Sequence, residues 1–168
     1  MKKMTEKFLS DAFAGESMAH MKYMIFSEIA ERKGFRNLAR LFKAIAYAEQ
    51  VHATNHARNL GIVKDDIVLD IQSCIEGENY EVTEMYPVFK NSAVLQEEKK
   101  AETSFRYALE AEKIHEELYR KVKSKVEKGS DIELEEVYIC PVCGYTHVGE
   151  PPERCPVCNA SSETFKKF

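Results

Sequence analysis

The chain contains two Glu-x-x-His motifs, Glu49–His52 and Glu112–His115, and an alanine precedes each of them. A Gly-Glu pair stands ahead of each motif and ends at Glu16 in the first case and at Glu78 in the second. Residues at i and i+3 of a helix point the same way, so each motif aims a carboxylate oxygen and an imidazole nitrogen at one point. Two such motifs, with single glutamates from two other helices, can hold two metal ions inside a bundle.

These acidic residues lie on otherwise apolar helical stripes, where an ionised carboxylate without a partner costs several kcal/mol. Because no lysine or arginine shares the stripes between Glu16 and Tyr23 or between Ile45 and His52, cations are expected to balance the charge. Five carboxylates carry −5, which two ferrous or two ferric ions balance to within one unit, although manganese also remains open. The second half has one extra carboxylate, Glu81, so the site is expected to be asymmetric. The predicted metal ligands, which are also the predicted catalytic residues, are Glu16, Glu49, His52, Glu78, Glu81, Glu112 and His115.

A second metal site is predicted near the C-terminus. Two Cys-x-x-Cys pairs are separated by eleven residues, and the first pair is followed by Gly144, which suits the left-handed turn of a metal knuckle. Four thiolates favour a tetrahedral site for a soft metal. Spacing alone does not separate iron from structural zinc, but the proline-bearing knuckle and the redox site upstream favour iron. The predicted ligands of this single iron are Cys140, Cys143, Cys155 and Cys158.

Apolar residues that recur every three or four positions predict four helices, and these helices carry the glutamate and histidine ligands. Pro87 should kink the third helix, and the reversal into the fourth is placed near 95–98. A connection over 62–73 shows no helical period and is expected to cross the bundle from one end to the other. Tyr23 and Tyr86 lie on or beside the site-bearing faces and are predicted to donate hydrogen bonds to ligand carboxylates. The predicted helices are residues 4–33, 35–60, 74–94 and 98–128.

The 168 residues suffice for one bundle (1–130), an acidic linker (131–136) and a cysteine module (137–168) that is too small to fold without a metal. A net charge of −4 and a pI of about 5.8 give no reason to expect nucleic acid as a partner. No membrane span and no convincing signal peptide can be recognised, so a cytoplasmic protein is expected. Four thiols in two pairs then indicate metal binding, not disulfides.

The chain as a whole resembles the rubrerythrin family, in which a ferritin-like di-iron bundle precedes a rubredoxin-like domain. The segments GESMAHMKY, AEQVH, GENYEVTEMYP and AEKIHEELY resemble the four ligand helices, and CPVCGY and CPVC resemble the rubredoxin-like tail. The resemblance implies that Glu49 and Glu112 bridge the irons, and that His52 and Glu81 compete for one of them. The turn between the third and fourth helices departs from the acidic, glycine-ended run of many relatives.

The resemblance implies a mainly α, cytoplasmic peroxidase that reduces hydrogen peroxide to water and protects against oxidative stress. Electrons would come from an external carrier or reductase and pass through the four-cysteine iron to the di-iron site. A homodimer is implied, with the tail of one subunit near the bundle of the other. One alternative is a ferroxidase or iron-handling protein of the ferritin-like class. Another is a binding module whose tail is a zinc ribbon.

Overall fold

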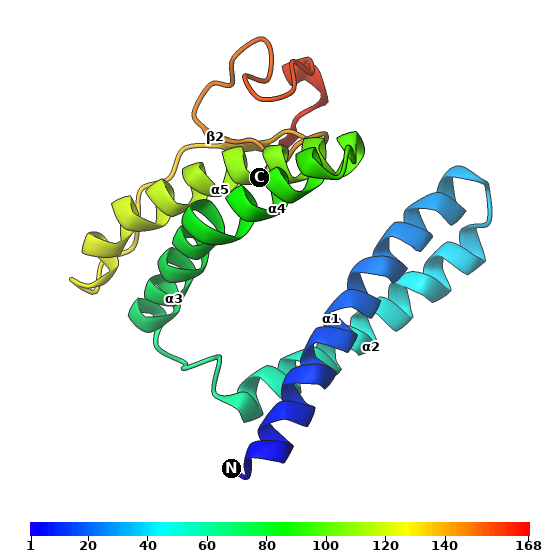
Figure 1. Ribbon diagram of the computed structural model, residues 1–168, viewed down its shortest axis with the longest axis vertical. Helices are drawn as coiled ribbons and strands as arrows, with labels where there is room; N and C mark the ends of the chain where they lie inside the picture. Colours follow the sequence, from blue (N-terminus) through cyan, green and yellow to red (C-terminus); the bar gives the residue numbers. More distant parts are fainter. The chain divides into compact units, whose positions relative to one another are not determined.

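The computed structural model describes all 168 residues, and the chain divides into two compact units, residues 1–65 and 66–168. Unit 1 is a pair of long helices (Figure 1), and unit 2 combines further helices with a small sheet. None of the helices is both long enough and apolar enough to cross a membrane. The mainly α class predicted from the sequence is confirmed.

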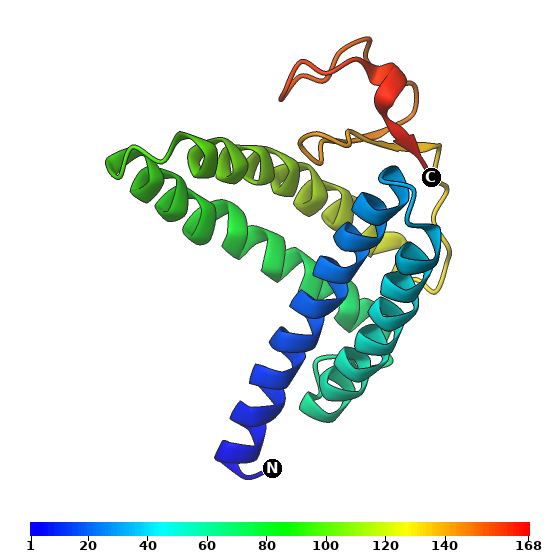
Figure 2. The same ribbon diagram turned by 90° about the vertical axis from the view of Figure 1, so that its right-hand side faces the viewer.

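In unit 1, α1 (Lys3–Arg32) and α2 (Arg36–Leu60) lie side by side in both views (Figures 1 and 2). Small side chains make this approach possible, since the fully buried apolar residues of the pair are all alanines. Ser27 is also buried and donates a 2.8 Å hydrogen bond to the carbonyl oxygen of Ala39. The predicted bounds of these two helices are confirmed to within one residue.

Many of the larger apolar side chains of unit 1 remain exposed. Several of them belong to the stripes that carry the predicted ligands, so the face around Glu16 and Glu49 is apolar but uncovered within the helix pair. A two-helix unit cannot bury both stripes of its own helices against each other. The exposed apolar residues on the ligand-bearing stripes are Phe8, Phe26, Leu38, Leu41 and Ile45.

Unit 2 begins with α3 (Ile67–Tyr80), a π-helical turn η1 (Glu81–Met85) and α4 (Tyr86–Leu95), which together form one long interrupted helix. It then reverses into α5 (Lys99–Val126), as predicted near 95–98. The reversal uses Glu97 at φ 58° in place of a glycine. Asparagine, aspartate or glycine is usual in that conformation, so the sequence carries no strong local signal for the turn.

The predicted connection over 62–73 is wrong. The third helix begins at Ile67 and not at residue 74, which leaves only Gly61–Asp66 between α2 and α3. Asp66 is the reason, because its side chain accepts hydrogen bonds from the backbone N–H groups of Val68 and Leu69 at 3.0 and 3.2 Å. This N-cap starts the helix in a segment whose apolar residues show no clear helical period.

The two halves of the helical region repeat the same pattern, a glutamate followed by a Glu-x-x-His motif, and the π-helical turn explains an irregularity in the spacing of this repeat. Glu49 and Glu112 are 63 residues apart, as are Tyr23 and Tyr86, whereas Glu16 and Glu78 are only 62 apart. The second half therefore holds one extra residue between its first glutamate and its tyrosine. A π-helical turn accommodates such an insertion without rotating the flanking faces out of register, and these turns occur frequently at functional sites. Pro87 follows directly, where its missing N–H falls in the first turn of α4.

The cysteine module completes unit 2. Its antiparallel sheet has the order β2-β1-β3, with β1 (Val137–Ile139) between β2 (Thr146–Val148) and β3 (Lys166–Lys167). One 3₁₀ turn, Ser162–Thr164, precedes β3. The module packs on α5, where Tyr107 contacts the buried cysteines. The limits 1–130, 131–136 and 137–168 stay a prediction for the domains, since the compact units divide at 65/66.

Candidate metal centres

The first ligand group lies in unit 1 and consists of Glu16 from α1 with Glu49 and His52 from α2. Their ligand atoms lie within 4.8 Å of one another. His52 Nδ1 is 3.0 Å from Glu49 Oε2 and 3.7 Å from Glu16 Oε1. Half of the His52 side chain is exposed (53%), so this group is open on one side. The i, i+3 spacing has placed both motif residues toward the glutamate of the neighbouring helix, as predicted.

The second ligand group lies in unit 2 and consists of Glu78 from α3 with Glu112 and His115 from α5. Their ligand atoms also lie within 4.8 Å of one another. His115 Nδ1 is 2.6 Å from Glu112 Oε2, and both side chains are largely buried. The two groups therefore repeat the same three residue types in the same arrangement, one glutamate facing one Glu-x-x-His motif.

The electrostatics of the second group indicate a shortage of positive charge. Burial and the nearby carboxylate of Glu112 raise the pKa of Glu78 to about 7. The hydrogen bond from His115 lowers the pKa of Glu112, and the same bond raises the pKa of His115. The imidazolium is thus the cation on which the metal-free group relies, and a bound metal ion would take over that role.

Glu81 lies at the edge of the second group and outside its tight cluster. Burial and, to a smaller extent, the negative charge of Glu112 raise the pKa of Glu81, so Glu81 lies close enough to interact with the second ligand group. Burial also raises the pKa of Tyr86, as do the charges of Glu81 and Glu112, which places the phenol near these carboxylates. Tyr23 stacks on Phe42 with ring centroids 6.4 Å apart. Hydrogen bonds from Tyr23 and Tyr86 to ligand carboxylates stay predictions.

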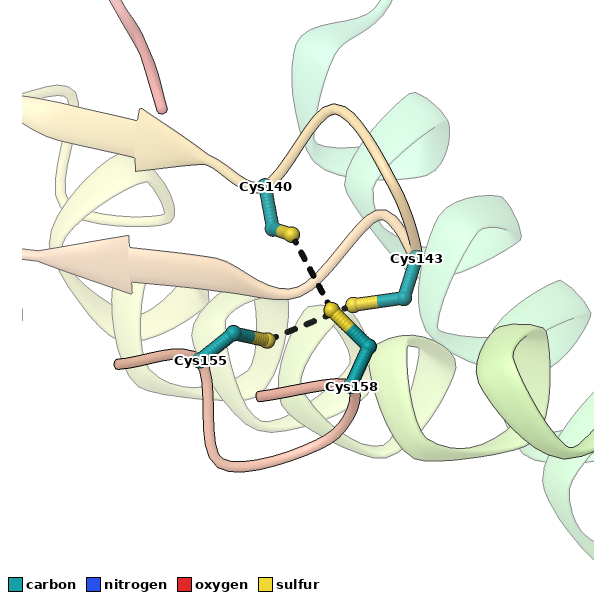
Figure 3. A group of neighbouring side chains, drawn as sticks. All are labelled: Cys140, Cys143, Cys155 and Cys158. Atoms are coloured by element: carbon teal, nitrogen blue, oxygen red, sulfur yellow. Dashed lines mark hydrogen bonds between the residues drawn. The ribbon is translucent and has the colours of Figure 1, made fainter. Parts of the chain in front are cut away.

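The four predicted cysteines converge in the C-terminal module (Figure 3). Cys140 Sγ lies 3.5 Å from Cys158 Sγ, and Cys143 Sγ lies 3.4 Å from Cys155 Sγ. All four are free thiols, and these distances are far from a disulfide bond. Four sulfurs bound tetrahedrally at about 2.3 Å would be separated by about 3.8 Å, so the cluster needs only a small expansion to accept a metal ion.

Each cysteine knuckle has the same backbone. Cys140 N–H donates to the carbonyl of the residue five positions later, Tyr145, and Cys155 N–H does the same with Ala160. The residue after each second cysteine is left-handed, Gly144 at φ 79° and Asn159 at φ 64°. Burial raises the pKa of Cys143, so the thiolate form that binds a metal needs the metal's charge.

A residue that sequence reasoning missed lies between the two candidate metal sites of unit 2. Thr146, only 6% exposed, places its Oγ1 2.8 Å from His115 Nε2 and 3.2 Å from the carbonyl oxygen of Gly144. Gly144 directly follows Cys143 in the first knuckle. Its α-carbon also approaches α5, because a Cβ added there would meet Ala111 at 3.8 Å. No signal in the sequence could have found Thr146, because it is 31 residues from its partner.

These contacts place the cysteine module against α5 of its own chain. A hydrogen bond from the Arg106 guanidinium to the carbonyl oxygen of Val157 adds a second tie between them, at 3.3 Å. Within this chain the module contacts the helix that carries Glu112 and His115, and the implied position of the tail near the bundle of another subunit stays a prediction.

The donor atoms fit the metals that the family resemblance implies. Carboxylate oxygens with one imidazole per group match the ligands of the ferritin-like di-iron and di-manganese class, and four cysteine sulfurs match a single soft metal. The imidazole of His115 is also oriented for ligation, because Thr146 engages it at Nε2 and leaves Nδ1 directed at the carboxylates.

Two family models match the chain. The model described as "Rubrerythrin" matches residues 7–123, and the model described as "Rubrerythrin, rubredoxin-like domain" matches residues 138–166. Together they cover both ligand groups and all four clustered cysteines.

Curated relatives extend over nearly the full length. "Rubrerythrin-2" of Clostridium acetobutylicum is 43% identical, with 98% of this chain and 97% of the relative covered. "Nigerythrin" of Nitratidesulfovibrio vulgaris is 34% identical, with 95% and 84% covered. Solved structures of nigerythrin in a mixed-valent and in an all-ferrous state match with a TM-score of 0.56 and 32% identity, covering 98% of this chain and 86% of nigerythrin.

Proposed function

Since the chain belongs to the rubrerythrin family, whose members are oxidative-stress di-iron proteins, we propose that it reduces hydrogen peroxide to water at a di-iron centre. Electrons would reach that centre from the four-cysteine iron. The observation that carries this proposal is the hydrogen-bonded path between the two ligand sets of unit 2, which runs from His115 through Thr146 to the carbonyl of Gly144, the residue after Cys143. A thiolate-bound iron beside a carboxylate-bound pair is the arrangement that an internal electron relay requires.

The ligands of the di-iron centre would be the two repeated groups, each with one Glu-x-x-His motif and one further glutamate. Glu49 and Glu112 would bridge, and Glu81 would exchange with His52 at one position. The reaction consumes two electrons and two protons for each peroxide and yields two waters. Iron held by these residues would supply the two electrons and the Lewis acidity that peroxide reduction needs.

The protein's own groups would manage the protons and the geometry. Thr146 accepts the Nε2 proton of His115, so Nδ1 is the nitrogen that faces the carboxylates and would exchange its proton for a metal ion. Glu81 in the π-helical turn has a raised pKa and lies beside the ligand group, so it is suited to carry a proton inward. Tyr86 stays protonated near the same carboxylates, because its pKa is raised.

The external donor would be a small redox carrier or a reductase that reaches the cysteine module. The second knuckle offers the place of entry, because Cys158 is only partly buried whereas the other three cysteines are buried. Free thiols that stay unpaired also suit a reducing compartment such as the cytoplasm. The functional assembly would be a homodimer.

Stopped-flow mixing tests the peroxidase proposal. Fully reduced protein should reoxidise much faster with hydrogen peroxide than with air-saturated buffer, followed through the absorption of both ferric centres. Equal or slower oxidation by peroxide would contradict the proposal and favour the ferroxidase alternative. That alternative also predicts many irons turned over per chain and a large shell, which light scattering would detect.

Metal analysis after anaerobic purification tests the relay. Three irons per chain are expected, and the ferric four-thiolate iron should be red because of sulfur-to-iron charge transfer. A colourless protein with one zinc per chain would make the module a structural zinc ribbon and would remove the relay.

A further inference from the structure

The connection between α2 and α3 is too short for the topology that the family fold demands. A ferritin-like bundle contains one long crossover connection between two parallel helices. In this chain, short turns join α1 to α2 and α4 to α5, so only the connection between α2 and α3 is left to make the crossover. That connection consists of six residues, Gly61–Asp66.

The helix lengths show how far a crossover would have to reach. Glu49 lies eleven residues before the end of α2 at Leu60, and Glu78 lies eleven residues after the start of α3 at Ile67. At 1.5 Å per residue each stretch is about 16.5 Å long. If α2 and α3 ran parallel with these two glutamates level at one metal pair, the chain would have to travel about 33 Å back along the bundle.

The six residues cannot cover that distance. Seven Cα–Cα steps from Leu60 to Ile67 span at most about 25 Å when fully extended. The caps at both ends shorten this reach further. The N–H group of Ile62 donates a 3.1 Å hydrogen bond to the carbonyl oxygen of Ala57, and Asp66 caps the first turn of α3. Closing the bundle within one chain would break both caps, and even a fully extended connection would then be too short.

We infer that two copies of this chain exchange their helix pairs, so that α1 and α2 of one copy complete the di-iron site on α3–α5 of the other. This inference rests on the proposed di-iron function and adds that each site takes Glu16, Glu49 and His52 from one subunit. The remaining ligands come from the partner copy. The short connection then joins one bundle to the other and does not have to run along the length of either bundle.

The exposed apolar faces support a second copy as the occupant. The ligand-bearing face of unit 1 presents Phe26, Leu41 and Ile45 beside an incomplete ligand group. The only surface in the chain with the complementary ligands is on α3–α5, where Glu78, Glu112 and His115 repeat the same arrangement. Because the chain's own copy of that surface lies beyond the reach of the crossover, an identical chain is the partner with matching chemistry.

Complementation between two inactive variants tests the exchange. One variant carries Glu49→Ala with His52→Ala, and the other carries Glu112→Ala with His115→Ala. The two chains are co-expressed with different affinity tags, and the heterodimer is isolated through both. Exchange predicts one intact site per heterodimer, with half the bundle iron of the wild-type dimer and a mixed-valent signal in electron paramagnetic resonance. Each variant alone should hold no intact pair.

A heterodimer with no more bundle iron than the two parent variants would overturn the exchange. A matched control inserts ten Gly/Ser residues after Lys64 in both variants. With the lengthened connection the bundle can close within one chain, so the heterodimer should contain less bundle iron than it does with the short connection.

A metal-free measurement separates this inference from the proposed function. Dimers are prepared from a mixture of ¹⁵N-labelled and unlabelled chains that carry a photoreactive benzophenone side chain at Ile45, on the ligand-bearing stripe of α2. Exchange predicts that half of the cross-links from position 45 to residues 67–126 join peptides of different isotope. Cross-links of a single isotope only would overturn it. Wild-type protein without bundle iron but with mixed-isotope cross-links would reject the di-iron function and keep the exchange.

Discussion

At the scale of single residues, Thr146 lies between the second ligand group and the cysteine cluster, where it contacts His115 and the carbonyl of Gly144. Thr146→Val keeps the side-chain volume and removes the 2.8 Å contact with His115 Nε2. Loss of a partner that orients a ligand imidazole typically lowers metal affinity or activity 10- to 100-fold, so we expect peroxide turnover to fall by about tenfold or more. The rate of electron transfer from the cysteine iron, measured by stopped flow, checks this.

The control for that substitution is Thr164→Val in the same module. Thr164 donates only to the carbonyl oxygen of Ser161 and touches no histidine. Both variants should lose about 1 kcal/mol of stability, as expected for one hydrogen bond. Equal turnover in the two variants would show that Thr146 has only a structural role.

The carboxylates of the second ligand group predict a pH dependence of the metal-free protein. Burial raises the pKa of Glu78 from 4.5 to about 7, and the hydrogen bond with Glu112 raises the pKa of His115 above 6.5. Groups with raised folded-state pKa values stabilise the fold below their unfolded pKa, and this stability is lost as pH rises through the folded value. The melting temperature of the metal-free protein should therefore fall from about pH 5 to pH 8.

Glu78→Gln should flatten that decline between pH 4.5 and 7, because the amide does not titrate. Glu112 has a lowered pKa, so its ionised carboxylate stabilises the fold over this range. That contribution is lost only at more acidic pH, as Glu112 becomes protonated. Added ferrous iron should raise the melting temperature most at the alkaline end, where the carboxylates are ionised. A melting temperature that rises from pH 5 to pH 8 without metal would contradict this account.

At the scale of secondary-structure elements, the π-helical turn is where the two halves of the chain differ. Deletion of Glu81 should restore the spacing of the first half, so that η1 becomes regular α-helix and Glu78 and Tyr86 keep their common face. We expect the deletion variant to fold and to melt higher than Glu81→Ala, which loses the carboxylate but keeps the extra residue. Circular dichroism melting compares the two.

Both variants should still bind two irons in the bundle, because the ligands of the two repeated groups remain. Both should also reduce peroxide more slowly if Glu81 exchanges with His52. If the deletion variant melts well below Glu81→Ala, the extra residue is not accommodated in this turn.

At the scale of the whole molecule, the proposed relay makes the metal in the cysteine module decisive for sustained turnover but not for a single reaction. Protein loaded with zinc in the module and iron in the bundle should oxidise once with peroxide at the wild-type rate. It should then fail to be re-reduced by the external donor. Zinc preserves the tetrahedral four-thiolate site but cannot change its oxidation state, so the zinc- and iron-loaded proteins differ only in the redox activity of the module.

The measurement is a single-turnover trace followed by steady-state peroxide consumption, with the bundle iron content matched between the two preparations. Equal steady-state rates in the zinc- and iron-loaded forms would show that electrons enter the bundle without passing through the cysteine module.

The amino-acid sequence determined the features that depend on local spacing. The i, i+3 geometry of a helix brings glutamate and histidine to one point wherever the motif stands, and the structure confirms this at His52 and His115. The same holds for the cysteine knuckles, whose hydrogen bonds span five residues. The reversal near 95–98 was also predictable, because two helices of a pair must turn somewhere between their apolar stripes.

Only the tertiary structure decided what depends on distant or weakly patterned residues. Thr146 meets His115 across 31 residues, and no periodicity encodes such a contact. The early start of α3, in contrast, is a local feature that apolar periodicity did not reveal, because Asp66 caps the helix through Val68 and Leu69, two and three residues away. That start in turn shortens the connection to six residues and limits which helix pairs can share a metal site. Local chemistry therefore specifies the ligands, whereas chain length and caps decide how they can be brought together.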